Sequence, residues 1–229
     1  MTVFILFGCG LISVLLYILA YQRLQPKKNM LMKTISSTFF LAVGVCAFHY
    51  NSDSLSYTQW VLLGLGCGFL GDITLAFKEI YPEHRHTFLI VGLLLFLVGH
   101  VFYLVALAKH LSYPVLLYIS IILLITLVII VINQFKVKLT FGKTKWACFL
   151  YTLAINTLLV VAILNLFGDG SRFKIVVAVG AFFFVVSDYI LSLLYFAKLS
   201  STKRRNLKII NLLLYYFGQL LIALSILLA

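Results

Sequence analysis

Charged residues are scarce in this sequence, and acidic residues are the scarcest of all. Only 10% of the 229 residues are charged, with 6 Asp and Glu against 18 Lys and Arg, whereas soluble globular proteins contain about 25% charged residues. Hydrophobic residues make up 63%, including 20 Phe and 13 Tyr. A soluble fold cannot bury that much apolar surface, and a disordered chain would be poor in aromatic residues. The composition therefore predicts a protein whose solvent is lipid.

The motifs of several enzyme classes are also missing. The sequence has no GxSxG elbow, no HExxH pair, no Walker loop and no glycine-rich dinucleotide turn. Only one histidine, His100, lies well inside an apolar stretch, so zinc ligands are not expected to converge. We therefore expect no metal and no organic cofactor. Cysteines stand singly in apolar segments without CxxC spacing, which indicates packing residues; they are Cys9, Cys46, Cys67 and Cys148.

Long apolar runs are what the sequence does have. A spanning helix needs about 20 apolar residues, and eight stretches meet this length: 2–21, 31–49, 57–77, 87–108, 112–132, 146–167, 173–197 and 208–228. No connection between them can hold a soluble domain. We predict an all-α integral membrane protein, a bundle of eight transmembrane helices in one domain over residues 1–229. The first stretch lacks a basic leader and a clear cleavage site, so it is interpreted as a retained helix.

The basic residues are distributed unevenly between the connections. Of the 18 Lys and Arg, 15 fall in the odd-numbered connections and only Lys109, Arg172 and Lys174 in the even-numbered ones. Positive residues stay on the cytoplasmic side, which predicts a multi-pass protein with both termini away from the cytoplasm, in the inner membrane if the source is bacterial. The same rule explains the net charge of +12 without a nucleic-acid partner.

The third and seventh apolar stretches share a short pattern. Both Gly71–Leu75 and Ser187–Leu191 read small-Asp-x-x-Leu, and both helices are predicted to run in the same direction. At the same offset, His100 and Tyr103 correspond to Tyr216 and Gln219. Two parallel four-helix repeats would produce this pattern. Chance similarity between two apolar helices is the other explanation.

Two carboxylates lie inside apolar stretches, where an ionisable group costs about 2.5–3.5 kcal/mol and by default indicates function. These are Asp72 and Asp188, and both are predicted in the cytoplasmic half of their helices. A rise of 1.5 Å per residue places Asp72 about 7 Å and Asp188 about 13 Å from the predicted helix ends. Each could instead satisfy a neighbouring polar group. Two in matching local sequence favour a functional role.

Other polar residues occur at helical spacing near these carboxylates. Gly64, Gly68 and Asp72 share one face, and His100 and Tyr103 lie one turn apart. The last apolar stretch aligns Asn211, Tyr215 and Gln219. We expect Asp72, Asp188 and the polar side chains of the other helices to line one pocket. Lys33, at the predicted start of the second helix, is either a positive-inside anchor or a ligand for a lipid phosphate.

Five short motifs occur in an order that resembles the YhhN-like lysoplasmalogenase family of eight-helix membrane proteins, over the full length of the chain. They follow a lysine, Lys33, that comes after a basic loop; here it is followed by Thr34, where the family usually has proline. The motifs are Gly71-Asp72-x-x-Leu75, Gly99-His100-x-x-Tyr103, Tyr151, Ser187-Asp188-x-x-Leu191 and Tyr215 to Gln219.

The resemblance implies hydrolysis of the vinyl ether of a lysoplasmalogen to a fatty aldehyde and glycerophospho-ethanolamine or -choline, with a lysophospholipid and water as substrates. Vinyl ether cleavage needs a proton donor and a group that stabilises the resulting cation, and two carboxyl groups in different environments can supply both. The resemblance thus implies Asp72 and Asp188 as catalytic residues. Asp188, with Phe182 to Phe184 nearby and predicted deeper, is the expected acid. Expected substrate-binding residues are Lys33, His100, Tyr103, Tyr151, Asn156, Ser187, Tyr215 and Gln219.

Two other classes of function fit the same residues. A proton- or cation-coupled transporter, or a protein that translocates lipids, could use Asp72 and Asp188 as ion sites between repeats. A purely structural membrane protein is the third reading, which the clustering of polar residues disfavours.

Overall fold

A computed structural model shows eight α-helices and describes residues 1–51, 55–132, 139 and 144–229. The described residues contain no strand, and short 3-10 turns occupy Pro82–His84, Ala108–His110 and Ile226–Leu228. The prediction of an all-α fold with eight helices is confirmed. The helices are α1 (Thr2–Ala20), α2 (Pro26–Tyr50), α3 (Leu55–Ile80), α4 (Arg85–Leu107), α5 (Val115–Ile132), α6 (Lys145–Asp169), α7 (Arg172–Phe196) and α8 (Ser201–Ser225).

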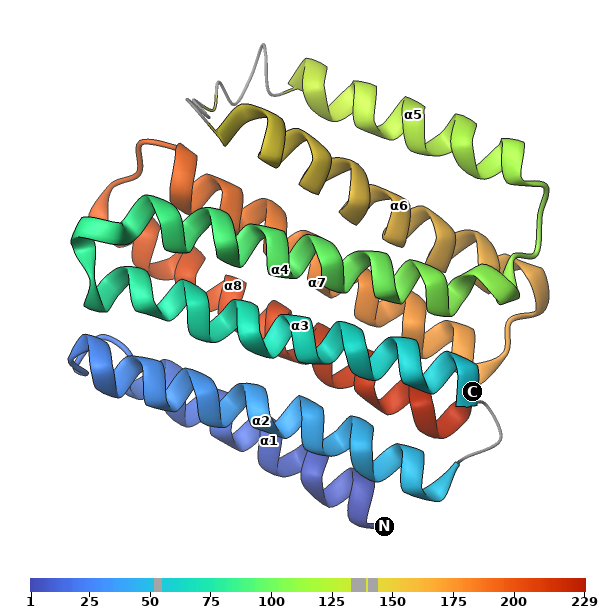
Figure 1. Ribbon diagram of the computed structural model, residues 1–229, viewed down its shortest axis with the longest axis horizontal. Coiled ribbons are helices and arrows are strands. Elements are labelled where there is room, and N and C mark those ends of the chain that lie inside the picture. The colour runs from blue at the N-terminus through green and yellow to red at the C-terminus, as the bar shows by residue number, and fades with distance from the viewer. Residues whose placement is uncertain (52–54, 133–138, 140–143) are drawn as a thin grey trace.

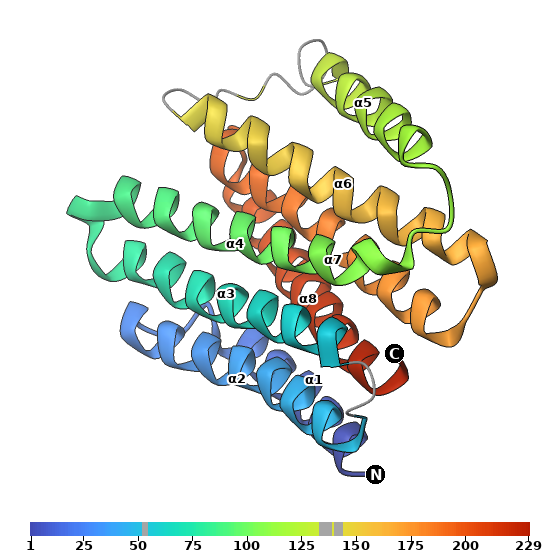
Figure 2. The ribbon, with the colours of Figure 1, turned by 45° about the vertical axis from the view of Figure 1, so that its right-hand side comes forward.

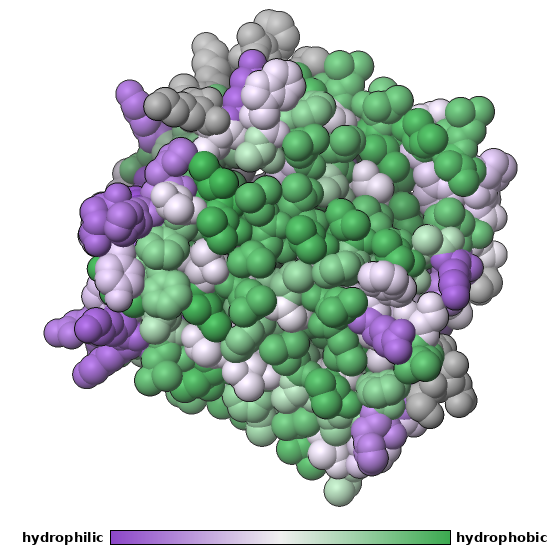
Figure 3. Space-filling model, viewed as in Figure 1, coloured by the Kyte–Doolittle hydropathy of each residue, from purple (hydrophilic) through white to green (hydrophobic). Residues whose placement is uncertain are grey.

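The surface of the bundle is that of a membrane protein. By length and composition, seven of the eight helices are long and apolar enough to cross a membrane. The exception is α5, a shorter apolar helix that lies beside α6 at the edge of the bundle in both ribbon views (Figures 1 and 2). Apolar side chains cover the middle of the face seen in Figure 3, and hydrophilic side chains gather toward its two ends. The chain is therefore a multi-pass membrane protein.

Three helices extend three or more residues further toward the basic connections than predicted. α2 begins at Pro26 instead of residue 31, because proline fits the first turn of a helix. α8 begins at Ser201 instead of residue 208, because the Ser200 side chain caps it by accepting a hydrogen bond from the Lys203 amide at 3.4 Å. α3 continues to Ile80, three residues past its predicted end. Basic residues assigned to connections thus lie on helical turns, although Lys136, Lys138 and Lys143 are outside the described residues.

Part of the helix packing is repeated between the two halves of the chain. Within each half consecutive helices are neighbours, and the closest pairs are α3 with α4 and α7 with α8. Between the halves, α2 packs against α8 and α6 packs against α4. The second helix of each half thus packs against the last helix of the other half. This exchange supports the interpretation of two parallel four-helix repeats.

Glycines bring both closest helix pairs into backbone contact. A Cβ on Gly99 of α4 would lie 3.1 Å from the Gly64 carbonyl oxygen of α3, and a Cβ on Gly218 of α8 would lie 2.9 Å from the Gly180 carbonyl oxygen of α7. Small residues allow such an approach between membrane helices. Gly64 and Gly180 each lie eight residues before the aspartate of their helix. The close approach therefore lies at the same distance along the helix from the aspartate in both pairs.

Both termini lie at one end of the bundle, opposite the connections α1–α2, α3–α4 and α7–α8 (Figure 1). Those connections and the adjoining helix turns carry most of the described basic residues. We therefore expect the end of the bundle with these connections to face the cytoplasm, and the end with the two termini to face away from it. A fluorescent reporter fused after Arg23 should fluoresce in cells, and alkaline phosphatase fused after Ala229 should be active. The exchanged reporters serve as controls. Fluorescence at both positions would contradict this orientation.

Candidate functional site

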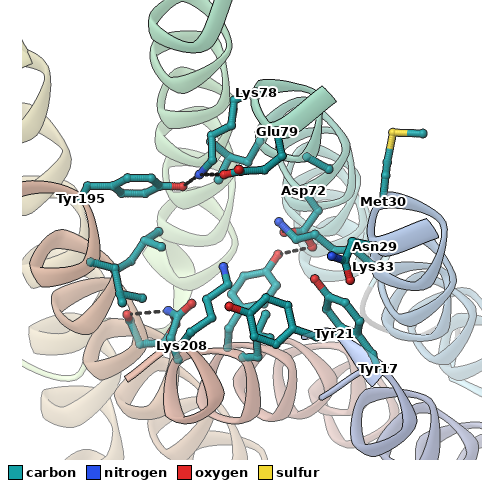
Figure 4. A pocket seen from close by; sticks show the side chains of 18 of the residues that line it. Tyr17, Tyr21, Asn29, Met30, Lys33, Asp72, Lys78, Glu79, Tyr195 and Lys208 are labelled. Carbon is teal, nitrogen blue, oxygen red and sulfur yellow. Dashed lines mark hydrogen bonds and ion pairs between the residues drawn. The ribbon is translucent and has the colours of Figure 1, made fainter. Parts of the chain in front are cut away.

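A cavity of about 390 Å³ lies between the helices at the end of the bundle that carries these connections. It is close to the ends of α1, α3 and α7 and the starts of α2 and α8, and its wall combines charged, aromatic and aliphatic side chains (Figure 4). Six helices contribute to it, through side chains such as Tyr17, Lys33, Asp72, Phe96, Asp188 and Tyr215. Both aspartates singled out from the sequence therefore line the same cavity.

Asp72 on α3 is an ion-paired carboxylate with every oxygen engaged. The Lys33 amino group of α2 lies 2.9 Å from its Oδ1. The hydroxyls of Ser37 on α2 and Tyr215 on α8 donate hydrogen bonds to its Oδ2, at 2.6 and 2.8 Å. Its side chain is only 2% exposed, and the cation and the two donors compensate for its burial.

Asp188 on α7 has a different environment. The Tyr151 hydroxyl of α6 donates a hydrogen bond to its Oδ2 at 2.7 Å, and His100 Nε2 of α4 lies 3.8 Å from the same oxygen. Among the described residues no lysine or arginine pairs with it. Because burial disfavours a charge that has no counterion, the neutral acid is more accessible at Asp188 than at Asp72.

The orientation of the His100 ring is fixed by its neighbours. Its Nδ1 lies 2.6 Å from the Phe96 carbonyl oxygen, so Nδ1 carries the hydrogen and donates it. The ring stacks on Phe184 at 4.9 Å between centroids. Nε2 therefore points toward Asp188, and it has no hydrogen-bond partner among the residues that the structure describes. His100 lies beside Asp188 and does not line the cavity.

The two carboxylates are at the same depth. Asp72 lies eight residues before Ile80, and Asp188 lies eight residues before Phe196, which corresponds to about 12 Å in each helix. The predicted depth of about 7 Å for Asp72 was wrong because α3 continues three residues past its predicted end, whereas the depth of about 13 Å for Asp188 was close to the observed value. Depth therefore does not distinguish the acid from its partner, whereas the Lys33 ion pair does.

A second group of predicted residues packs behind the cavity. The Tyr103 hydroxyl donates a hydrogen bond to Gln219 Oε1 at 2.8 Å, which connects α4 to α8. A side chain at Gly64 would overlap the Tyr103 ring, and a Cβ at Gly68 would lie 3.0 Å from Gln219 Nε2. The small face of α3 is thus explained by the polar side chains that it accommodates, and neither Tyr103 nor Gln219 lines the cavity.

The remaining predicted residues divide between the cavity and the scaffold. Ser187 lines the cavity. Asn211 Nδ2 donates hydrogen bonds to the Ser187 carbonyl oxygen at 2.9 Å and to the Ser187 hydroxyl at 3.0 Å. Asn156 lies elsewhere, where its Oδ1 accepts a hydrogen bond from Tyr189 and its Nδ2 donates one to Thr126 at 3.3 Å. Asn156 therefore connects α6 to α5 and α7 outside the cavity wall.

Several residues of the site were not predicted. Ser37 follows Lys33 by one helical turn, and Tyr195 follows Asp188 by two turns, so spacing could have indicated both. Lys208 shares the face of α8 that carries Asn211 and Tyr215. The lysines near helix ends were instead counted as charges of the connections.

The cavity wall has more cations than carboxylates. Its basic residues are Lys33, Lys78, Arg85, Arg204 and Lys208, against Asp72, Glu79 and Asp188. The Lys78 amino group contacts the Tyr195 hydroxyl and lies 3.7 Å from Glu79 Oε1. Arg204 Nη1 donates a hydrogen bond to the Leu194 carbonyl oxygen at 2.7 Å. The cavity is therefore suited to a ligand with an anionic group.

The described part of the chain holds no group of three or more His, Cys, Asp or Glu side chains arranged to bind a metal ion. What the site offers is one charged carboxylate, one carboxyl without a cationic partner and an excess of positive charge near the mouth. Such a set can bind an anionic amphiphile and exchange a proton with it.

Comparison with known proteins gives one match. The model of the YhhN family matches residues 28–226, which covers both aspartates and most residues of the cavity wall. Neither the curated proteins nor the solved structures contain a match.

Proposed function

The chain belongs to the YhhN family, and on that premise we propose that it is a membrane-embedded hydrolase that cleaves the vinyl ether bond of lysoplasmalogens. The products would be a fatty aldehyde and glycerophospho-ethanolamine or -choline. The observation that carries the proposal is the pair of carboxyl groups, Asp72 and Asp188, that line one cavity in unlike environments.

Asp188 is proposed as the general acid. Cleavage begins when a proton is added to the alkenyl carbon two bonds from the ether oxygen, which leaves an oxocarbenium ion at the carbon attached to that oxygen. A buried carboxyl group without a cationic partner is the better proton donor of the two. Tyr151 of α6 donates a hydrogen bond to its side chain and the His100 ring of α4 lies beside it, so both are proposed as positioning residues.

Asp72 is proposed to stabilise the oxocarbenium ion and to orient water. The general acid must carry a proton, whereas Asp72 must carry a negative charge to stabilise a cation. The ion pair with Lys33 and the hydrogen bonds from Ser37 and Tyr215 favour that charge. Water then adds to the cationic carbon and gives a hemiacetal. Its collapse breaks the bond to the glycerol oxygen, which takes a proton, and the aldehyde is released. The overall reaction consumes one water and requires no oxidant or reductant.

The position of the cavity suits a lipid with one chain. Exposed Glu79, Arg85 and Arg204 lie at its mouth near the helix ends, where a headgroup would remain hydrated. The carboxyl groups lie about 12 Å further along the helices, where a vinyl ether would be reached and the alkyl chain would continue into the bilayer.

The reaction can be tested with protein purified in detergent. We expect aldehyde to be released from 1-alkenyl lysophospholipid and not from the matched 1-alkyl lysophospholipid, which lacks the double bond. In deuterium oxide the new aldehyde should carry one deuterium on the carbon next to the carbonyl group, because the acid delivers solvent-derived hydrogen to that carbon. A preformed aldehyde incubated with the protein controls for later exchange.

The same assay tests the transporter alternative, which the partly repeated packing of the two halves favours. A transporter would produce no aldehyde in detergent, where no membrane separates two compartments. Absence of aldehyde with folded protein would contradict the proposed hydrolase.

A further inference from the structure

Lys208 on α8 is a cation that lines the cavity and makes no direct ion pair with a carboxylate of the described chain. Its side chain is partly buried and lines the cavity, and Figure 4 shows its amino group pointing into the space between Tyr195 and Tyr17. It forms no hydrogen bond and no ion pair with any described residue. A partly buried ammonium group without a counterion is costly, so its position indicates an anionic ligand.

The neighbouring cations are already engaged. Lys33 is paired with Asp72, Lys78 contacts Tyr195 and Glu79, and Arg204 binds a backbone carbonyl. Arg85 is exposed at the mouth of the cavity, where water solvates it. Lys208 is therefore the inner cation with all of its donors available, and the surrounding positive charge increases its attraction for an anion.

We propose that Lys208 is the phosphate-binding residue of this cavity and that it takes the phosphate group of a glycerophospholipid headgroup. Lysine binds phosphate as a compact charge with three donors. The proposal rests on the proposed lipid hydrolase and names the part of its site that holds the headgroup. The phosphate role considered for Lys33 passes to Lys208, because Lys33 is occupied by a catalytic carboxylate.

Position along the helix supports this assignment. Lys208 precedes Tyr215 by two helical turns on the same helix face, and Tyr215 donates a hydrogen bond to Asp72. A phosphate held by Lys208 would therefore lie toward the mouth of the cavity, with the rest of the lipid directed inward to the two carboxyl groups. This order, from anionic headgroup to ether bond to alkyl chain, is the order in the lipid itself.

The test uses a lipid that cannot be cleaved. Tritiated 1-alkyl lysophosphoethanolamine is titrated onto the whole protein in nanodiscs, and unlabelled 1-alkylglycerol, which has no phosphate, is used as a competitor. We expect Lys208→Gln to weaken binding of the phospholipid about ten- to a hundredfold, the usual range for a hydrogen bond to a charged group. The apparent affinity for alkylglycerol should not change.

Two matched variants control for folding and for general charge. Lys203→Gln removes an exposed lysine of the same helix that does not line the cavity, and it should bind like the wild type. Lys208→Arg keeps the charge and should retain most of the affinity that Lys208→Gln loses. Unchanged phospholipid binding in Lys208→Gln, or an equal loss in Lys203→Gln, would overturn the proposal.

Inorganic phosphate distinguishes the two sources of this anion. If millimolar phosphate displaces the tritiated lipid from the wild type and not from Lys208→Gln, Lys208 binds free phosphate and the lipid assignment is overturned. If phosphate does not displace it, the headgroup is the ligand. Because the probe lipid has no vinyl ether, these results do not depend on catalysis. A protein that binds through Lys208 but releases no aldehyde would refute the proposed hydrolase alone.

Discussion

We expect the Asp188→Asn variant to release aldehyde about 10²- to 10⁴-fold more slowly than the wild type, the usual loss when a general acid is removed. Asparagine keeps the shape of the side chain and can still accept the hydrogen bond from Tyr151. It cannot deliver a proton to carbon. The loss should appear in kcat, since the acid acts in the transition state more than in substrate binding.

The rate comparison needs a folded variant and a neutral control. Glu83→Gln removes a carboxylate from the exposed turn between α3 and α4, outside the cavity wall, and should leave kcat unchanged. Binding of the non-cleavable 1-alkyl lysophospholipid shows whether the Asp188→Asn site is intact. A folded Asp188→Asn variant with near wild-type turnover would mean that Asp188 is structural.

The second large effect concerns folding. Replacing Lys33 with methionine should lower the free energy of unfolding by about 3–5 kcal/mol, the cost of leaving one charge of a buried pair alone. Asp72 is 2% exposed and Lys33 only 13% exposed, so water that enters the cavity replaces the lost cation only in part. Unfolding in mixed micelles with increasing denaturing detergent measures the change.

A double substitution separates this cost from catalysis. In Lys33→Met/Asp72→Asn the isolated charge is absent, so most of the lost stability should return. The variant should remain inactive, because the charged group proposed to stabilise the cation is also absent. Lys28→Met, an exposed lysine earlier on α2, controls for charge at the membrane surface. If Lys33→Met is as stable as the wild type, or the double variant is no better than the single one, the pair is not structural.

The sequence was sufficient to predict the number of helices and the two aspartates. Apolar runs of spanning length have one physical explanation in a chain this poor in charge, and a carboxylate within such a run is conspicuous. The ends of the helices were harder to predict, because polar residues at the membrane surface are compatible with either helix or loop. Lys78 and Glu79 were assigned to a connection for this reason, yet they lie on the last turns of α3.

The partners of the two aspartates could not be predicted in the same way. Which helix faces which is decided by packing across the bundle, and no local pattern records that Lys33 meets Asp72 or that Tyr151 meets Asp188. The positive-inside rule also accounted for Lys208 without a binding role. It assigns the charge of Lys208 to the cytoplasmic side and does not indicate whether the side chain enters a cavity.

Each of the two aspartates has a neighbour from the other half of the chain, and this limits how such a site can arise. Asp72 of the first half is bound by Tyr215 of the second, and Asp188 of the second half is approached by His100 of the first. Neither half contains a complete site, so an isolated half would have to associate with a copy of itself. In that symmetric dimer both carboxylates would have identical neighbours and equal proton affinity. Joining the halves in one chain lets one aspartate acquire a lysine while the other does not, and this fixed difference assigns the roles of acid and counterion to particular residues.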